Sequence, residues 1–249
     1  AAAYPMKNLL ATNGYDAQVK TLDARAGFSA TANGEIDVIP DVWLPTTHGS
    51  YVDRYGSRLD PLGCWYDNAR LTIAVNNSSP AQSIADLQTL GGAYGNTLVG
   101  IEPGAGETSV VINRVIPEYG LENLTFRSSS TTDMLGSLQQ ATAEQQNIAV
   151  TLWRPHWAYT EFDIRDLADP KGAMGGTEGI WNFATTGFGD SAPKAAQMFT
   201  NLILADADLA DLGYLMVEQY DRVDPDSAVV EWLGTRPDFA DRLVGGTLG

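Results

Sequence analysis

Two short segments of the sequence each place a tryptophan at the end of an apolar run, with a proline within two residues. The first reads PDVWLPTTH and contains Trp43, and the second reads LWRPHW and contains Trp153. Strand ends in open α/β sheets are common ligand sites. An indole ring held there is costly to leave exposed unless an apolar or cationic group covers it. Both tryptophans are therefore candidates for binding a small ligand through their ring faces.

A glycine-rich turn, PGAG over 103–106, separates an expected strand from an expected helix. Glycines allow close approach, and the first-turn N–H groups of a helix favour an anion, so Gly106 is a candidate for binding an oxyanion. A structural turn explains the same residues equally well. Two specific motifs are excluded, because a P-loop needs a Gly-Lys pair and a dinucleotide fingerprint needs glycine where Ser109 stands.

Other residue types that carry catalysis are sparse. The two histidines, His48 and His156, are far apart in the sequence and belong to no Cys/His cluster, which argues against a zinc site. Cys64 is the sole cysteine, so no intrachain disulfide is possible, and the chain contains no G-x-S-x-G nucleophile motif. We therefore expect no metal, no cofactor and no catalytic constellation.

The remaining tryptophans divide by their surroundings. Trp232 lies within an expected helix and is predicted to be core, and Trp157 at an expected helix start is predicted to pack as well. Trp65 and Trp181 lie near the expected crossings between lobes and remain open between packing and ligand binding.

Composition narrows the class of partner. Acidic residues outnumber basic ones by 31 to 15 in 249 residues, and the formal net charge is −16. This balance argues against nucleic acid or an anionic membrane surface as a partner. No apolar run approaches the ~20 residues that a membrane-spanning helix requires.

Apolar periodicity and turn residues predict alternating helices and strands, hence an α/β fold with a parallel sheet and helices on its faces. The expected helices begin with 4–12 and 26–32, include 132–145, and account for everything after Ser191. The expected strands cover 16–22, 36–42, 71–75, 98–101 and 148–153, and Ser79 is expected to cap a helix. Chain crossings near 75–77 and 177–183 predict two lobes, one of 1–76 plus 181–249 and one of 77–180.

Four stretches in order along the chain resemble the glycine betaine-type substrate-binding proteins of ABC importers. They read GEIDVIPDVWLPTTH, VGIEPGAG, VTLWRPHW with DIRDLADPKG, and DPDSAVVEWLGTRPDFADRL. The resemblance implies a two-lobed type II periplasmic-binding-protein fold with a ligand cleft between the lobes. It implies an aromatic cage with Trp43 and Trp153 as walls, His48 as polar anchor and Gly106 with its neighbour as amide donors.

The sequence departs from that family's pattern in three ways. Family members usually begin with a strand that leads into a further cage residue, whereas this sequence opens on a helix, so we expect that strand to lie ahead of the residues given. Glu107 replaces an apolar residue after the glycine turn, and Trp65 and Trp181 are additional aromatics. A carboxylate at 107 would repel a ligand carboxylate, which favours trimethylamine N-oxide or choline, while glycine betaine, carnitine and dimethylsulfoniopropionate stay possible.

The resemblance thus predicts the extracytoplasmic binding component of an ABC importer, without catalytic activity. Its partners would be a small methylated ammonium ligand and a membrane permease. We expect a periplasmic monomer exported by a signal peptide outside this sequence. Two alternatives stay open, namely an enzyme of the same architecture with Glu107 as general base, and a sensor domain.

Overall fold

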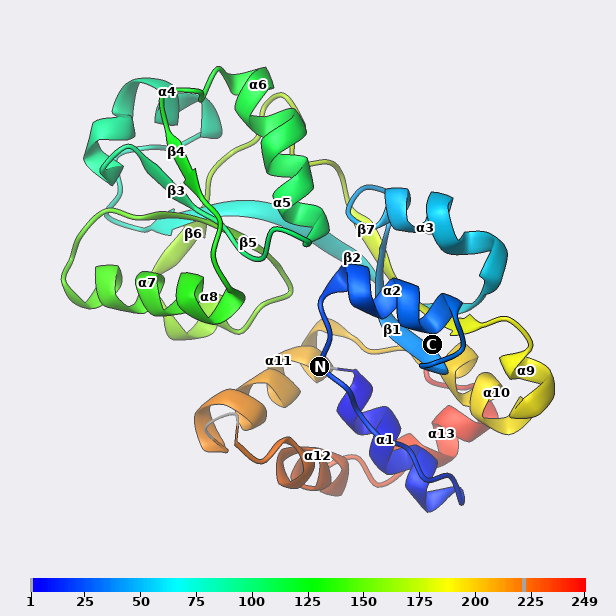
Figure 1. Ribbon diagram of the computed structural model, residues 1–249. Helices are drawn as coiled ribbons and strands as arrows, with labels where there is room; N and C mark the ends of the chain where they lie inside the picture. The colour runs from blue at the N-terminus through cyan, green and yellow to red at the C-terminus, as the bar shows by residue number, and fades with distance from the viewer. Residues whose placement is uncertain (1, 221–222) are drawn as a thin grey trace. The chain divides into compact units, whose positions relative to one another are not determined.

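The computed structural model describes residues 2–220 and 223–249, and these residues form two compact units (Figure 1). The first unit comprises Ala1–Ala69 and Glu178–Gly249, and the second comprises Arg70–Thr177. Each unit contains β-strands with helices on both faces. This mixture of helices and strands confirms the predicted α/β class.

The strands of the first unit are β1 (Val38–Leu44), β7 (Glu178–Thr185) and the first part of the long strand β2 (Leu59–Asn76). β7 lies between the other two and pairs with both in antiparallel register. The prediction of a parallel sheet is therefore wrong here, because a strand from late in the chain takes the central position.

Two helices cover one face of this sheet, α2 (Ala24–Ala32) and α3 (Gly49–Tyr55). Phe28 and Tyr55 from these helices join Val42 and Phe183 from the strands in one apolar cluster. The Asp23 carboxylate caps α2 by accepting the Ala26 N–H at 2.8 Å. Local capping and burial of one helix face thus agree with the predicted helix.

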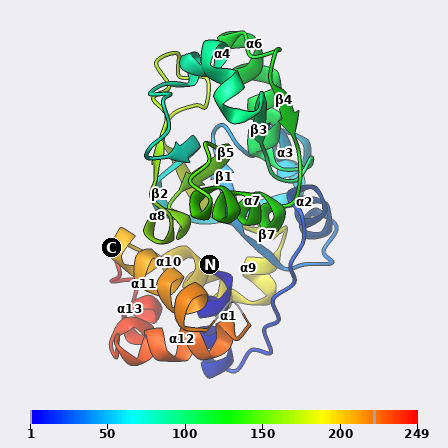
Figure 2. The same ribbon diagram turned by 90° about the vertical axis from the view of Figure 1, so that its left-hand side faces the viewer.

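The other helical elements of this unit gather away from α2 and α3, as Figure 2 shows. Lys7 in the first of them pairs with Asp226 at 2.6 Å, and Trp232 is fully buried as predicted. These elements are α1 (Ala3–Thr12), α9 (Phe188–Ser191), α10 (Pro193–Asn201), α11 (Asp206–Tyr214), η5 (Leu215–Gln219), α12 (Pro225–Gly234) and α13 (Phe239–Gly245), whereas the short η1 (Gly56–Arg58) directly follows α3.

In the second unit the end of β2 pairs antiparallel with β5 (Ala149–Arg154) and with β6 (Ile164–Asp166). The short strand β3 (Thr97–Val99) runs parallel to β5 and to β4 (Thr125–Arg127). The parallel arrangement predicted for the whole sheet is thus limited to these three strands.

The helix α7 (Thr131–Ala143) covers one face of these strands with the apolar residues that its periodicity predicts. A continuous helical run follows the glycine-rich turn on the other face, made of α5 (Gly106–Val110), η4 (Val111–Val115) and α6 (Ile116–Tyr119). The remaining elements are η2 (Ile84–Asp86), α4 (Leu87–Leu90), η3 (Gly91–Tyr94) and α8 (Ala158–Glu161).

Two local predictions are wrong. The helical turn after Ser79 begins only at Ile84, because Ser83 and Asp86 form the capping box instead. Residues 16–22 form no strand, although Tyr15, Ala17 and Val19 are half-buried in alternation with exposed neighbours. The extended, alternating segment is present, but no described residue pairs with its backbone.

We expect the amide hydrogens of residues 16–22 to exchange with solvent faster than those of 71–75, by at least about two orders of magnitude. The reason is that the amides of 71–75 lie within β2, which is paired with β5, whereas no backbone N–H of 16–22 donates to another backbone group of the described residues. Hydrogen exchange followed by mass spectrometry measures both segments in one experiment. Equal protection of the two segments would show that 16–22 has backbone partners in solution.

Candidate functional site

The first candidate set lies where β1 ends and the chain turns into α3. The Trp43 N–H donates to Nδ1 of His48 at 2.9 Å, and the His48 N–H donates back to the Trp43 carbonyl at 2.9 Å. These two reciprocal bonds close the intervening residues into a compact loop. The structure therefore brings together two residues that the resemblance implies in ligand binding.

His48 is held as a neutral ring. Only 9% of its surface is exposed, and it meets Phe28 and Tyr51 edge-on at centroid distances of 5.4 and 6.1 Å. Burial lowers the pKa of His48 from its ordinary value of 6.5 to about 4, although the charge of Asp41 opposes this change. Since Nδ1 accepts a backbone N–H, the proton of the neutral ring belongs on Nε2, which can donate to an oxygen.

The ring of Trp43 is fixed from its polar edge. Its indole Nε1–H donates to the Asp41 carboxylate at 2.7 Å, and 8% of the residue is exposed. Asp41 therefore orients the indole and places a negative charge beside it. A negative charge near an aromatic face adds to the attraction that such a face has for a cation.

The second candidate set lies in the second unit, where β5 ends. Trp153 packs edge-on against His156 with ring centroids 4.7 Å apart, and His156 in turn lies 5.3 Å from the Trp157 ring. The His156 Nδ1 accepts the Ala158 N–H at 3.1 Å, which fixes that ring as well. Trp157 packs on the core as predicted, and half-buried Trp153 lies at the core edge.

A polar network holds this second loop. Arg154 donates to Asp166 at 2.7 Å, and its guanidinium lies 3.5 Å from the centre of the Tyr159 ring. Tyr159 also donates to Asp166, and Thr72 bonds its hydroxyl at 2.7 Å. Burial, followed by the charge of Asp166, raises the pKa of Tyr159, so its hydroxyl stays protonated. The loop that bears Trp153 is thus anchored to β2 and β6.

Gly106 and Glu107 begin the helix α5, and both are buried, with Glu107 only 2% exposed. The first-turn N–H groups of a helix have no intrahelical acceptor, and they favour negative charge. Glu107 therefore has a structural explanation in addition to the role the sequence predicts. Ala105, the residue that precedes this helix, packs against the same apolar cluster as Trp153.

The other two aromatic candidates make structural contacts within the first unit. Trp65 is 4% exposed, and its indole N–H donates to the Pro40 carbonyl at 2.8 Å. Trp181 packs on the apolar cluster beneath α2 and α3. Because Trp43 pairs with Ile180 while Trp181 pairs with Val42, Trp43 and Trp181 point to opposite faces of the sheet.

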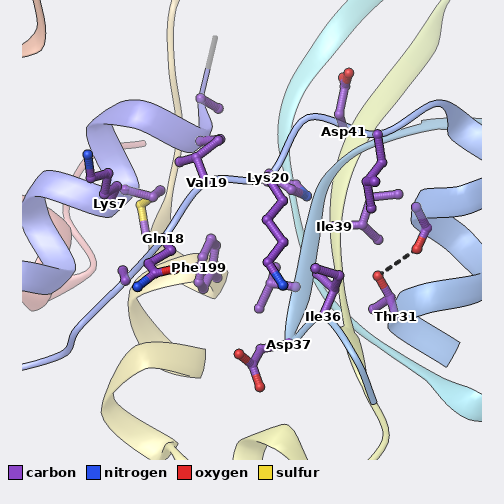
Figure 3. A pocket seen from close by; sticks show the side chains of 18 of the residues that line it. Lys7, Gln18, Val19, Lys20, Thr31, Ile36, Asp37, Ile39, Asp41 and Phe199 are labelled. Atoms are coloured by element: carbon purple, nitrogen blue, oxygen red, sulfur yellow. Dashed lines mark hydrogen bonds between the residues drawn. The ribbon is translucent and has the colours of Figure 1, made fainter. Parts of the chain in front are cut away.

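The first unit also contains a cavity of about 730 Å³ that the sequence did not predict. It lies between the extended residues 15–24 and the start of β1, with Phe28 and Phe199 among its apolar walls. In Figure 3 the Lys20 side chain lies between the backbone of residues 15–24 and the backbone at the start of β1, on the side of Asp37. His48 and Trp65 line this cavity, whereas Trp43 does not.

None of the helices in 2–220 and 223–249 has the length and apolarity needed to cross a bilayer. The same residues hold no cluster of three or more histidine, cysteine or acidic side chains arranged for a metal ion.

Each of the two α/β units thus holds a loop in which a tryptophan contacts a histidine. Residues 1–235 match the family described as the substrate binding domain of ABC-type glycine betaine transport system. The chain belongs to that family, whose members are transport substrate-binding domains and not enzymes. The alternative of an enzyme with Glu107 as general base is therefore wrong.

Individual relatives support the same family assignment. The chain is 34% identical over 159 residues to the glycine betaine/carnitine transport binding protein GbuC of Listeria monocytogenes. This match covers 63% of the chain and about half, 52%, of that relative. Lactococcal OpuAC, solved in a closed form with glycine betaine, is similar with a TM-score of 0.89 and 26% identity, over 98% of this chain and 93% of that one.

A second similar structure is the glycine betaine/L-proline-binding protein ProX of Borrelia burgdorferi. It has a TM-score of 0.90 and 25% identity, over 99% of this chain and 94% of that chain. A choline-binding protein solved with choline has a TM-score of 0.89 but 21% identity, so it supports the fold alone. Substrate-binding components of ABC importers act outside the cytoplasm, where they present a ligand to a membrane permease.

Proposed function

We propose that this chain is the substrate-binding component of an ABC importer and that its ligand is a small methylated ammonium compound. The observation that carries the proposal is the family match over residues 1–235. The relatives GbuC and OpuAC are named for glycine betaine, which makes methylated ammonium the shared chemistry. We further propose that the protein is a periplasmic monomer.

Trp43 and Trp153 are the rings proposed to contact the methyl groups. A trimethylated cation has no strong hydrogen-bond donor, so ring faces recognise it, each with about 0.5–2 kcal/mol. Contacts within each unit orient both rings, Trp43 through Asp41 and Trp153 through His156. Preorganised rings lose little conformational freedom on binding, which favours affinity.

His48 and Gly106 are proposed to contact the ligand oxygen. A neutral His48 with its proton on Nε2 donates one hydrogen bond, and the first-turn N–H groups of α5 supply others. An N-oxide, a carboxylate and a hydroxyl all present an oxygen that accepts such bonds. This polar contact orients a ligand that the rings alone would hold loosely.

Glu107 is proposed to select among these ligands. A buried carboxylate next to the amide donors repels a ligand carboxylate and favours a ligand without one. Trimethylamine N-oxide and choline satisfy this condition, whereas glycine betaine, carnitine and dimethylsulfoniopropionate do not. The proposed preference thus differs from the ligand in the names of the relatives.

Isothermal titration of the purified chain with these five compounds tests both parts of the proposal. We expect binding of at least one compound, with trimethylamine N-oxide or choline tighter than glycine betaine. Tight binding of glycine betaine with no response to the other two would reject the role of Glu107 while keeping the transport function. No heat from any of the five would overturn the proposed ligand class.

A further inference from the structure

Glu178, the first residue of β7, binds the loop that follows Trp43 although it lies more than 130 residues away in the chain. Its Oε1 accepts two consecutive backbone N–H groups, from Thr46 at 2.7 Å and from Thr47 at 2.8 Å. Its Oε2 accepts the hydroxyl proton of Thr47. One side chain, 2% exposed, therefore makes three hydrogen bonds to two adjacent loop residues.

The position of Glu178 is itself fixed by the sheet. The residue after it, Gly179, pairs with Leu44 of β1, and a Cβ at this glycine would lie 2.8 Å from both Cys64 Sγ and Trp181 Nε1. The side chains of Cys64 and Trp181 therefore pack closely on this glycine. A buried carboxylate on such a strand has little freedom to move, and it stays buried because its donors offset the cost of desolvation.

The loop held by Glu178 is the one that joins Trp43 to His48. The Trp43 N–H donates to His48 Nδ1, and the His48 N–H donates to the Trp43 carbonyl, so Thr46 and Thr47 lie inside a closed ring of hydrogen bonds. Without Glu178, two buried or half-buried N–H groups would lose their acceptor. The loop would then have to rearrange toward water to satisfy them.

We propose that Glu178 is the positioning residue of the first unit, which holds residues 44–48 in the one conformation that aligns Trp43 and His48 for the ligand. The part of this inference that concerns affinity rests on the proposed function. The part that concerns the loop rests only on the contacts of Glu178, so the two parts are tested separately.

The chain offers a matched control at Asp86 in the second unit. One oxygen of Asp86 accepts the backbone N–H groups of two consecutive residues, Gln82 at 2.8 Å and Ser83 at 2.9 Å. Its contacts thus resemble those of Glu178, but they cap η2 and involve none of the proposed ligand residues. Asp86 is less buried than Glu178, and Asp86→Ala removes a loop anchor outside the proposed site, so it reports the effect of a structural loss alone.

The first experiment needs no ligand. The chain has two histidines, so NMR titration with a His156→Gln background isolates the ring of His48. In Glu178→Ala we expect the pKa of His48 to rise from about 4 toward 6.5, because a released loop exposes the ring to water. In Asp86→Ala it should stay near its starting value. An unchanged His48 pKa in Glu178→Ala, with the protein folded, would overturn the inference.

The second experiment measures affinity for whichever of the five compounds the wild-type chain binds best. We expect Glu178→Ala to raise Kd about tenfold or more, and Asp86→Ala to leave it within about twofold. Glu178→Gln retains an oxygen for the two N–H groups and should recover most of the affinity. If Glu178→Ala does not fold, Thr47→Val removes the hydroxyl bond alone and should raise Kd about threefold.

The outcomes separate the two proposals. A raised His48 pKa without any ligand binding in the wild type would keep the positioning role and reject the proposed function. Wild-type binding that Glu178→Ala leaves unchanged would keep the function and reject the positioning role. Equal losses of affinity in Glu178→Ala and Asp86→Ala would also reject it, because general destabilisation would then explain both.

Discussion

Replacing Trp153 by alanine should weaken binding of the methylated ammonium ligand by about 1–3 kcal/mol, which is about 5- to 150-fold in Kd. The reason is that the variant removes one complete ring face from the end of β5. The ring is half-buried at the edge of the apolar cluster and contacts His156, so the variant leaves the fully buried part of that cluster in place. Isothermal titration with the best-binding compound measures the loss directly.

Two controls show whether the ring face itself is responsible. Trp153→Phe keeps an aromatic face at the same position and should recover at least half of the lost free energy. Tyr214→Ala removes an aromatic side chain that is 56% exposed on α11, and it should leave Kd unchanged. Unchanged affinity in Trp153→Ala, with the variant folded, would remove this residue from the proposed site.

Local sequence patterns predicted the helices well. The apolar spacing of α7 and the burial of Trp232 both follow from a period of 3.6 residues with one face turned to a core. Capping chemistry was less decisive, since Ser79 and Ser83 both look like helix starts. The structure selects Ser83 because Asp86 completes its capping box.

Strand pairing was predicted poorly because it joins distant parts of the chain. The alternation of helices and strands indicates a parallel sheet, yet β7 returns after residue 177 to pair antiparallel with β1 and β2. The sequence around Trp181 does not indicate with which strands β7 pairs. Residues 16–22 have the alternation of a strand, but alternation does not supply a partner.

In the candidate site, too, local features could be predicted from the sequence, whereas contacts between distant residues could not. Trp43 and Trp153 could be selected from their position at strand ends, and the structure adds that each has a histidine ring or nitrogen against it. The link from Glu178 to Thr46 and Thr47 left no signal in the sequence. Glu178 is one of 31 acidic residues, and the sequence does not indicate that this one contacts the loop of Thr46 and Thr47.

The neutral state of His48 makes stability depend on pH in a defined direction. The folded chain holds this ring with a pKa of about 4, because burial disfavours its charged form, whereas in the unfolded chain the pKa returns to about 6.5. As the pH falls below 6.5, His48 becomes protonated in the unfolded chain but stays neutral in the folded chain. The stabilisation is therefore complete above about 6.5 and is lost progressively as the pH approaches 4.

We expect the free energy of unfolding to fall by about 2–3 kcal/mol more in the wild type than in His48→Gln between pH 7 and pH 4.5. Urea unfolding at the two pH values measures each fall, and the difference between the proteins cancels the contribution of carboxylates that do not interact with His48. Tyr214→Ala, which removes an exposed side chain on α11, is the control, and it should keep the full wild-type fall. An identical fall in the wild type and in His48→Gln would mean that His48 titrates alike in the folded and unfolded chains. The neutral ring, and with it the Nε2–H donor proposed for the ligand oxygen, would then have to be abandoned.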